Sequence, residues 1–345
     1  MKKVLYLLFA FSILLAGCAK ASDPFQDEHR MKVVHTYTTV GNPLDMDSHG
    51  NMLFIADDFG GYHIYNTNTG ASIKSANYFT YAGVPSPLQV KLIRYNHFTK
   101  CMILLNRINS SNWQMEFFSL NNPTNPAWLD MSSGDTVDLQ SIVIKPSADT
   151  SLYDFAIYRS NKPNNKIKYS EIKLSNRPVQ RDVKEIITAY PPEKIDVDDQ
   201  YIYTAYGQLG ITIYNITTKA EVASFDTPGY ATDVKHKDGY IYVADRQAGF
   251  RVYKLDSSMN AECVYDYSTT SGYAENIKIK GNYAALSWNS RGVFLFDISN
   301  PEKIKLVDTL PSSEVGYVNN VLFSDSENNV LYVASRDKGV LKIEY

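Results

Sequence analysis

Two stretches, YATDVKHKDGYIYVADRQAGFRVYKLD at 230–256 and YAENIKIKGNYAALSWNSRGVFLFDIS at 273–299, follow the same order of residue types. In each, a polar residue and a short strand lead to a glycine turn, a second apolar strand, a loop and a third apolar strand. Short apolar runs bounded by Gly, Asp and Asn are typical of β-strands joined by tight turns. Because few letters agree while the order returns, the two stretches indicate a repeated structural unit whose chemistry varies.

The same order returns along most of the chain. Besides the two stretches above, clear copies are FIADDFGGYHIY (54–65), IYTAYGQLGITIY (202–214) and YVASRDKGVLKIEY (332–345). Two longer and less regular units carry LQVKLIRYNHFTKCMILLNRI (88–108) and LQSIVIKPSADTSLYDFAIYRS (139–160). Where a unit is complete, a fourth strand follows the third, as near 262–267. Seven units with a period of about 40–50 residues predict an all-β, seven-bladed propeller of four-stranded blades.

The two ends of the chain support this prediction. The seventh unit stops at Tyr345 after its third strand, while KVVHTYTTV (32–40) is a spare strand before the first unit. Pairing the spare strand with the last unit completes seven blades and closes the ring, which removes an open sheet edge. We therefore expect the stretch around Val34 to lie beside the stretch around Leu341.

The repeat, clearest in GNYAALSWNSRGVFLFDISNP (281–301), resembles the LVIVD repeats of extracellular β-propellers. The resemblance extends over most of 43–345, strongly in the first unit and in units four to seven, and weakly in the second and third. The shared residues are structural in kind, since Gly281-Asn282 forms a turn and Asn300-Pro301 ends a strand. The resemblance thus implies a fold and a location in the cell envelope, and it supplies no catalytic residues.

The first 18 residues differ from the repeats. Lys2 and Lys3 precede an apolar run of about a dozen residues, which suits a signal peptide and is too short to span a bilayer. The run ends in Leu15-Ala16-Gly17-Cys18, which resembles a bacterial lipobox and implies that Cys18 receives the lipid. An ordinary secretory signal with an incidental cysteine is the alternative.

The predicted organisation is therefore a lipoprotein signal peptide (1–18), a flexible polar tether (19–31) and the propeller (32–345). We expect lipid anchoring to the outer membrane of a Gram-negative cell envelope, on the periplasmic or the exposed side. Cys101 and Cys263 lie in units far apart, so we expect both to be small buried side chains and not a disulfide.

Signals for an enzyme are few. The sequence has no GxSxG elbow, no HExxH and no glycine-rich phosphate loop, and its six histidines fall at unrelated repeat positions. A net charge of −3 favours no nucleic-acid partner. No cofactor is predicted. Ca²⁺ held by Asp45 and Asp233 is an alternative that Lys194, in the same ring, makes less favourable.

Propeller topology places two sets of residues on one face of the ring, where they form a polar funnel. One set begins the innermost strand of each blade and the other follows the second strand. From these sets, the predicted ligand-binding residues are Asp45, Asp233, Asn276, Asn320, Arg159, Arg246, Trp288 and Arg336. The indole of Trp288 is expected to stack on a ligand. Structural roles stay open: the Asp and Asn side chains can bond across blades or hold loops, and the arginines can be solvated loop charges.

The sequence predicts a binding or scaffolding module for a glycan, a peptide or an envelope protein, or for a carboxylated small molecule. The alternative is a hydrolase or lyase of propeller type, acting on a polar or anionic substrate with Asp45 and Asp233 or with Arg246 and Arg336. Two carboxylates within proton-transfer reach of each other would favour catalysis.

Overall fold

The computed structural model describes residues 30–108, 113–131, 142–145, 155–161, 165–173 and 179–345. The chain divides into two compact units, Met1–Arg30 and Met31–Tyr345. Every named strand lies in the second unit. Within the described ranges, no helix combines the length and the apolar character that crossing a membrane requires.

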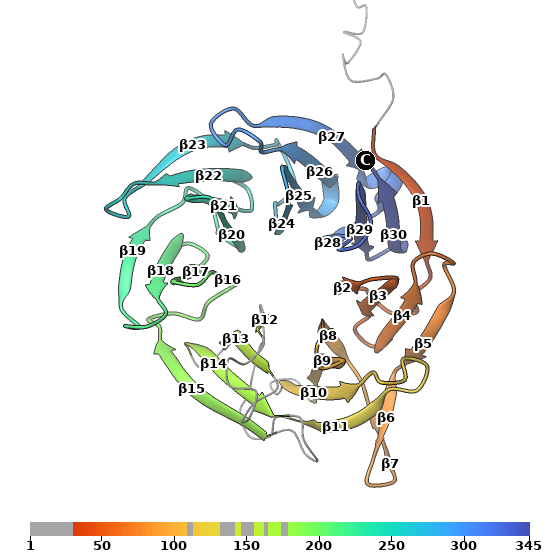
Figure 1. The fold of residues 1–345 in the computed structure, drawn as a ribbon. Coiled ribbons are helices and arrows are strands. Elements are labelled where there is room, and N and C mark those ends of the chain that lie inside the picture. Colours follow the sequence, from red (N-terminus) through yellow and green to blue (C-terminus); the bar gives the residue numbers. More distant parts are fainter. Residues whose placement is uncertain (1–29, 109–112, 132–141, 146–154, 162–164, 174–178) are drawn as a thin grey trace, which may run out of the picture. The chain divides into compact units, whose positions relative to one another are not determined.

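Seven four-stranded antiparallel sheets form the second unit, and they surround a central axis as the blades of a propeller (Figure 1). Blade 1 contains β2 (Asp45–His49), β3 (Met52–Ala56), β4 (Tyr62–Asn66) and β5 (Ser72–Ala76). Blade 2 contains β8 (Val90–Asn96), β9 (Cys101–Arg107), β10 (Trp113–Ser119) and β11 (Ala127–Met131). Blade 3 contains β12 (Ile142–Lys145), β13 (Phe155–Asn161), β14 (Lys166–Lys173) and β15 (Val179–Ile187).

The remaining blades follow the same plan from the inside outward. Blade 4 contains β16 (Ile195–Val197), β17 (Tyr201–Ala205), β18 (Ile211–Asn215) and β19 (Glu221–Phe225). Blade 5 contains β20 (Asp233–Lys237), β21 (Tyr240–Ala244), β22 (Phe250–Leu255) and β23 (Ala261–Tyr267). Blade 6 contains β24 (Asn276–Lys280), β25 (Tyr283–Trp288), β26 (Gly292–Asp297) and β27 (Lys305–Pro311). Blade 7 contains β28 (Val318–Phe323), β29 (Val330–Ser335), β30 (Gly339–Glu344) and β1 (Lys32–Tyr37).

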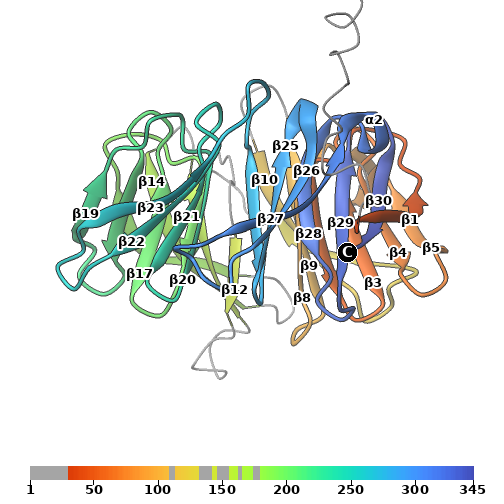
Figure 2. The ribbon, with the colours of Figure 1, turned by 90° about the horizontal axis from the view of Figure 1, so that it is seen from above.

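Blade 7 joins the two ends of the chain. β1 pairs antiparallel with β30, with Val33 opposite Ile343 and Thr36 opposite Leu341. The all-β, seven-bladed fold and its closure by the N-terminal strand are thus confirmed. Figure 2 shows the blades side on, with connecting loops at both ends of the strands.

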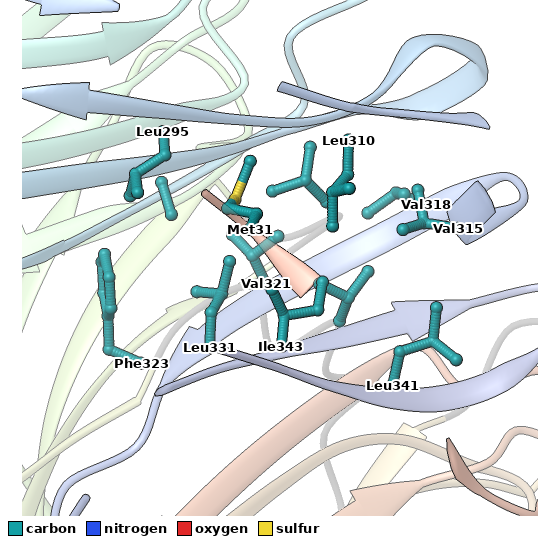
Figure 3. Close-up of a cluster of buried hydrophobic side chains, with 13 residues drawn as sticks. Met31, Leu295, Leu310, Val315, Val318, Val321, Phe323, Leu331, Leu341 and Ile343 are labelled. Carbon is teal, nitrogen blue, oxygen red and sulfur yellow. The ribbon is translucent and has the colours of Figure 1, made fainter. Parts of the chain in front are cut away.

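Apolar cores lie between neighbouring blades, because successive residues of a strand point to opposite faces of its sheet. Between blades 6 and 7, Leu295 and Leu310 meet Val321 and Ile343 (Figure 3). Met31 is 1% exposed in this cluster, and its backbone N–H donates to Asp308 Oδ2 at 2.8 Å. Burial of each such side chain contributes about 1.5–3 kcal/mol. The compact unit therefore begins one residue before the predicted start of the propeller.

The connection from blade 1 to blade 2 contains an additional hairpin that the sequence analysis did not predict. Its strands, β6 (Tyr78–Tyr81) and β7 (Val84–Pro87), pair only with each other and project outward from the ring (Figure 1). Two short helical turns also occur, η1 (Asn289–Arg291) and α2 (Ser312–Val315).

Candidate functional site

The innermost strands enclose a cavity of about 220 Å³ near the axis of the ring, which we call the central cavity. Asp45, Asp233, Asn276 and Asn320 all line it, so the structure brings together four of the eight predicted ligand-binding residues. They come from blades 1, 5, 6 and 7, at or near the start of each innermost strand. Whether they bind a ligand stays a prediction.

The two carboxylates in the central cavity hold neighbouring blades together. Asp45 Oδ2 accepts a hydrogen bond from the Ile93 backbone N–H of blade 2 at 3.1 Å. Asp233 Oδ2 accepts one from the Ile277 backbone N–H of blade 6, also at 3.1 Å. A carboxylate at the inner strand of one blade thus satisfies a backbone donor of the next, which is one of the structural roles left open above.

The asparagines continue this pattern around the ring. Asn276 Nδ2 donates to the Asn319 carbonyl of blade 7 at 2.6 Å. Asn320 Nδ2 donates to Asp45 Oδ1 of blade 1 at 2.8 Å. A second layer repeats the arrangement, since Asp47 accepts from the Tyr95 N–H and Asp196 accepts from the His236 N–H, each at 2.8 Å.

Cations also line the central cavity, and the sequence analysis assigned none of them to a ligand: Lys91, Arg94, Lys194, Lys235 and Lys278. Lys235 and Lys278 each lie two residues after a predicted site residue, Asp233 and Asn276. Because side chains two apart on a strand share a face, the alternation Asp-x-Lys and Asn-x-Lys was the available signal.

Most of these cations have a carboxylate partner. Arg94 forms an ion pair with Asp45. Lys194 Nζ lies 3.3 Å from Asp233 Oδ2 and also donates to Asn276 Oδ1. Lys235 Nζ lies 3.3 Å from Asp196 Oδ1 and 3.8 Å from Asp233 Oδ1.

Lys278 differs from them. No ion pair or hydrogen bond connects its ammonium group to any residue that the structure describes. Burial, followed by repulsion from Lys235, lowers the pKa of Lys278 to about 8. Burial lowers the pKa of Lys235 as well, but the attraction of Asp196 and Asp233 outweighs it and leaves that pKa raised.

The comparisons agree with the repeat and the fold. Residues 228–252 and 271–310, in blades 5 and 6, match the family model described as LVIVD repeat. The chain is a β-propeller that carries LVIVD repeats in blades 5 and 6. No curated protein sequence matches it significantly.

Solved structures similar to this propeller share only its fold. The WD40 repeats of RRP9 superimpose with a TM-score of 0.69 at 11% identity, covering 91% of this chain and 97% of that one. The computationally designed Ika8 protein gives a TM-score of 0.61 at 8% identity, covering 91% of this chain and 100% of that one.

Trp288 occupies a different place from the one predicted. Its side chain is 1% exposed and packs in the core of blades 5 and 6, with Tyr267 and Phe294 against its ring. The equivalent residue of blade 5, Asp245, holds the loop before the innermost strand by accepting from the Gly229 N–H at 3.0 Å. In blade 6 the Trp288 indole packs against the corresponding loop instead. A Cβ added to Gly272 would lie 3.1 Å from Trp288 Cδ1. The expectation that it stacks on a ligand was therefore wrong.

Arg246 and Arg336 follow the second strands of blades 5 and 7, and neither lines the central cavity. Each guanidinium covers a tyrosine of the loop that leads into its own blade. Arg246 lies 4.2 Å from the centre of the Tyr230 ring, and Arg336 lies 5.1 Å from that of Tyr317. The Arg159 side chain and Cys18, the predicted lipidation site, lie outside the described residues.

The other titratable groups give no metal site in the described part of the chain, where no three His, Cys, Asp or Glu side chains are grouped suitably. His63 Nε2 lies 2.9 Å from Asp57 Oδ2 in a buried pair that belongs to blade 1. Cys101 is buried as expected. Cys263 is exposed, against expectation, because it lies on β23, the outer strand of blade 5.

Proposed function

We propose that this LVIVD-repeat propeller is a binding module that holds an anionic group of its ligand in the central cavity. The observation that carries the proposal is Lys278, whose ammonium group lies among Lys194, Lys235 and Arg94 without an ion-pair partner in the described residues. A partly buried cation without an ion-pair partner is unfavourable, and a bound anion compensates for it.

The charges around the cavity support an anion over a cation. Lys91, Arg94, Lys194, Lys235 and Lys278 are five positive charges. Four carboxylates lie on or beside the same wall, those of Asp45, Asp47, Asp196 and Asp233. Among the described residues these carboxylates already accept backbone N–H groups, whereas the ammonium group of Lys278 has no ion-pair partner and can bind a ligand.

The size and polarity of the cavity limit the ligand class. A cavity of about 220 Å³ is smaller than the usual range for drug-sized ligands and suits one small group. Asn276, Asn319 and Asn320 add amide groups to the lysines. These features fit a small molecule with a carboxylate or a phosphate, or an acidic group of a larger ligand that enters from the funnel.

The geometry favours binding over hydrolysis or elimination. A general base needs a carboxylate that can accept a proton from a substrate. Asp45 and Asp233 are each held by a backbone N–H and a cation. Burial would raise the pKa of Asp233, but Lys194, Lys235 and Lys278 outweigh this effect and lower it, which makes the carboxylate a weaker base.

We further infer anchoring of the module to the cell envelope through Cys18, on the basis of the lipobox-like Leu15-Ala16-Gly17-Cys18. The check is labelling with a radioactive fatty acid during expression in a Gram-negative host. The label should be present in the protein and absent from Cys18→Ser. Equal labelling of both would contradict the anchor and leave the cavity proposal unaffected.

Calorimetric titration tests the anion site, with citrate and inorganic phosphate as the anions and choline as a cationic reference, at low ionic strength. We expect one of the anions to bind and choline not to bind. Lys278→Met should weaken the binding at least about tenfold, the usual order for a charge-assisted contact. Lys237→Met is the matched control, because Lys237 lies on an inner strand but does not line the cavity. Equal affinity of the two variants would refute the proposal, as would the absence of binding by both anions.

A further inference from the structure

A second cavity, of about 340 Å³, lies between the additional hairpin and blade 2, and we call it the hairpin pocket. The hairpin contributes Phe79, Tyr81 and Pro87, and blade 2 contributes Gln114, Glu116 and Met131. None of these residues lines the central cavity. The pocket therefore exists because of an insertion that the other described blade connections lack.

The hairpin is fixed over blade 2 by aromatic contacts. The Phe79 ring stacks on Trp128 of β11, with centroids 5.8 Å apart and planes at 21°. Tyr81 meets the same indole edge-on at 4.9 Å. Such pairs contribute about 0.5–1.5 kcal/mol each beyond the burial of their area. Tyr81 nevertheless stays 44% exposed, so part of its ring is available at the mouth of the pocket.

Glu116 is the unusual residue in this pocket. It is 0% exposed, and its carboxylate accepts from Gln114 Nε2 at 2.5 Å, Trp128 Nε1 at 2.9 Å and Asn106 Nδ2 at 3.4 Å. All three donors are neutral, and no cation forms an ion pair with Glu116 within the described residues. Burying a carboxylate without a counter-charge costs several kcal/mol, by order of magnitude. Burial accordingly raises the pKa of Glu116.

The side chains around Glu116 match one class of ligand. A carboxylate has about four acceptor positions, of which three are occupied here. Aromatic faces attract cations, and apolar walls suit a hydrocarbon body. Arg107, the cation of the pocket wall, lies over the Trp113 ring at 5.6 Å from its centre.

We propose that the hairpin pocket binds an organic amine, with the ammonium group beside Glu116 and the apolar body against Phe79, Tyr81 and Met131. The Gln114 amide lies at the place that the ammonium group takes, because its Nε2 is the donor closest to Glu116. The side chain of Gln114 is partly exposed, so it can turn aside while the ligand supplies the charge that the carboxylate lacks. This site is independent of the anion site in the central cavity.

Tyramine is the probe, with 4-ethylphenol as the same ring without the amine, both titrated calorimetrically into the protein. We expect tyramine to bind at least about tenfold more tightly than 4-ethylphenol, since the charge-assisted contact is absent from the phenol. Glu116→Gln should abolish this difference. Tyr81→Ala, on the exposed hairpin, should lower the affinity for tyramine at least about threefold. This variant tests the site if Glu116→Gln does not fold.

Two control variants separate this site from other effects. Tyr78→Ala changes a tyrosine of the same hairpin that does not line the pocket, and Lys278→Met changes the central cavity. Both should bind tyramine within about twofold of the original protein. Equal affinity for tyramine and 4-ethylphenol, no tyramine binding at millimolar concentration, or an effect of Tyr78→Ala as large as that of Tyr81→Ala would overturn the proposal. Loss of tyramine binding in Lys278→Met would overturn the independence of the two sites.

Discussion

Asn320 of blade 7 donates a hydrogen bond to Asp45 of blade 1 at 2.8 Å, across 275 residues of sequence. This contact closes the ring next to the central cavity, while the pairing of β1 with β30 closes it at the outer edge. Asp45 also holds blade 2 through the Ile93 N–H. One carboxylate thus connects three blades, and its side chain is nearly buried.

Asp45→Ala should destabilise the protein by about 3–5 kcal/mol, because it leaves the largely buried Arg94 without its ion-pair partner. Asp45→Asn retains an acceptor for the Ile93 N–H and should cost less, about 1–3 kcal/mol. Urea unfolding measures both. Asp325→Ala is the control, since Asp325 pairs with His49 between the same two blades at 3.1 Å but is exposed. It should cost under about 1 kcal/mol. A larger cost for Asp325→Ala than for Asp45→Ala would contradict the closure role.

Lys278→Met should stabilise the protein at pH 7 by about 1–3 kcal/mol, while it weakens anion binding. The pKa of Lys278 falls from 10.5 to about 8 in the folded state, so folding disfavours the charged form. Above pH 8 the folded protein loses this proton before the unfolded chain does, and the gain should shrink toward pH 10.5. Melting temperatures at pH 7 and pH 9.5 test this. A variant less stable than the original at pH 7 would contradict it.

Asp245→Asn should alter the pH dependence of stability between about pH 4 and pH 6. Burial raises the pKa of Asp245 from 3.8 to about 6, although Thr227 and the Gly229 N–H oppose the shift. The folded state therefore holds this proton more tightly, and the stability from it is lost as pH rises through 6. From pH 4 to pH 7 the variant should gain up to about 3 kcal/mol relative to the original protein. Denaturant unfolding across this range measures the change, with Asp266→Asn as the control for charge loss on the same blade. A difference in unfolding free energy between Asp245→Asn and the original protein that stays constant from pH 4 to pH 7 would contradict the raised pKa of Asp245.

Trp288→Ala should cost about 3–5 kcal/mol, because it leaves a cavity between blades 5 and 6. Trp288→Phe should cost about 1 kcal/mol or less, because the Nε1 that it removes has no hydrogen-bond partner among the described residues. Neither change should affect affinity for an anion when the protein is folded. Thermal unfolding and the citrate titration check both expectations. A loss of citrate affinity in a stable Trp288→Phe variant would show that the indole takes part in binding.

The fold was predictable because apolar strands of similar length returned at a near-constant period and left one strand spare. The β6–β7 hairpin escaped prediction because its turn uses Ala82-Gly83, with φ of 49° and 81°. Two-residue turns with positive φ at both positions usually carry Asn-Gly or Asp-Gly, and alanine gives no such signal.

The candidate site was predictable only in part. In blades 1, 4 and 5 the loop after the second strand bridges to the residues that begin or lead into the next innermost strand, as topology predicts. Topology did not give the distance of these residues from the axis. Trp288 and Arg246 lie at the ends of second strands, one strand further from the axis, where Trp288 is buried and Arg246 lies over the Tyr230 ring. Lys235 and Lys278 were not predicted, because the prediction used the first residue of each inner strand and not the residue two positions later on the same face.

The position of β1 at the outer edge of blade 7 has a consequence for biosynthesis. The strand is made first but its partner, β30, is made about 300 residues later. At about 5–20 residues per second, a ribosome needs roughly 15–60 s to supply that partner. During this interval β1 has no strand to pair with, and a chaperone or another chain can bind its edge. Blade 7 therefore cannot form until the end of the chain has been synthesised.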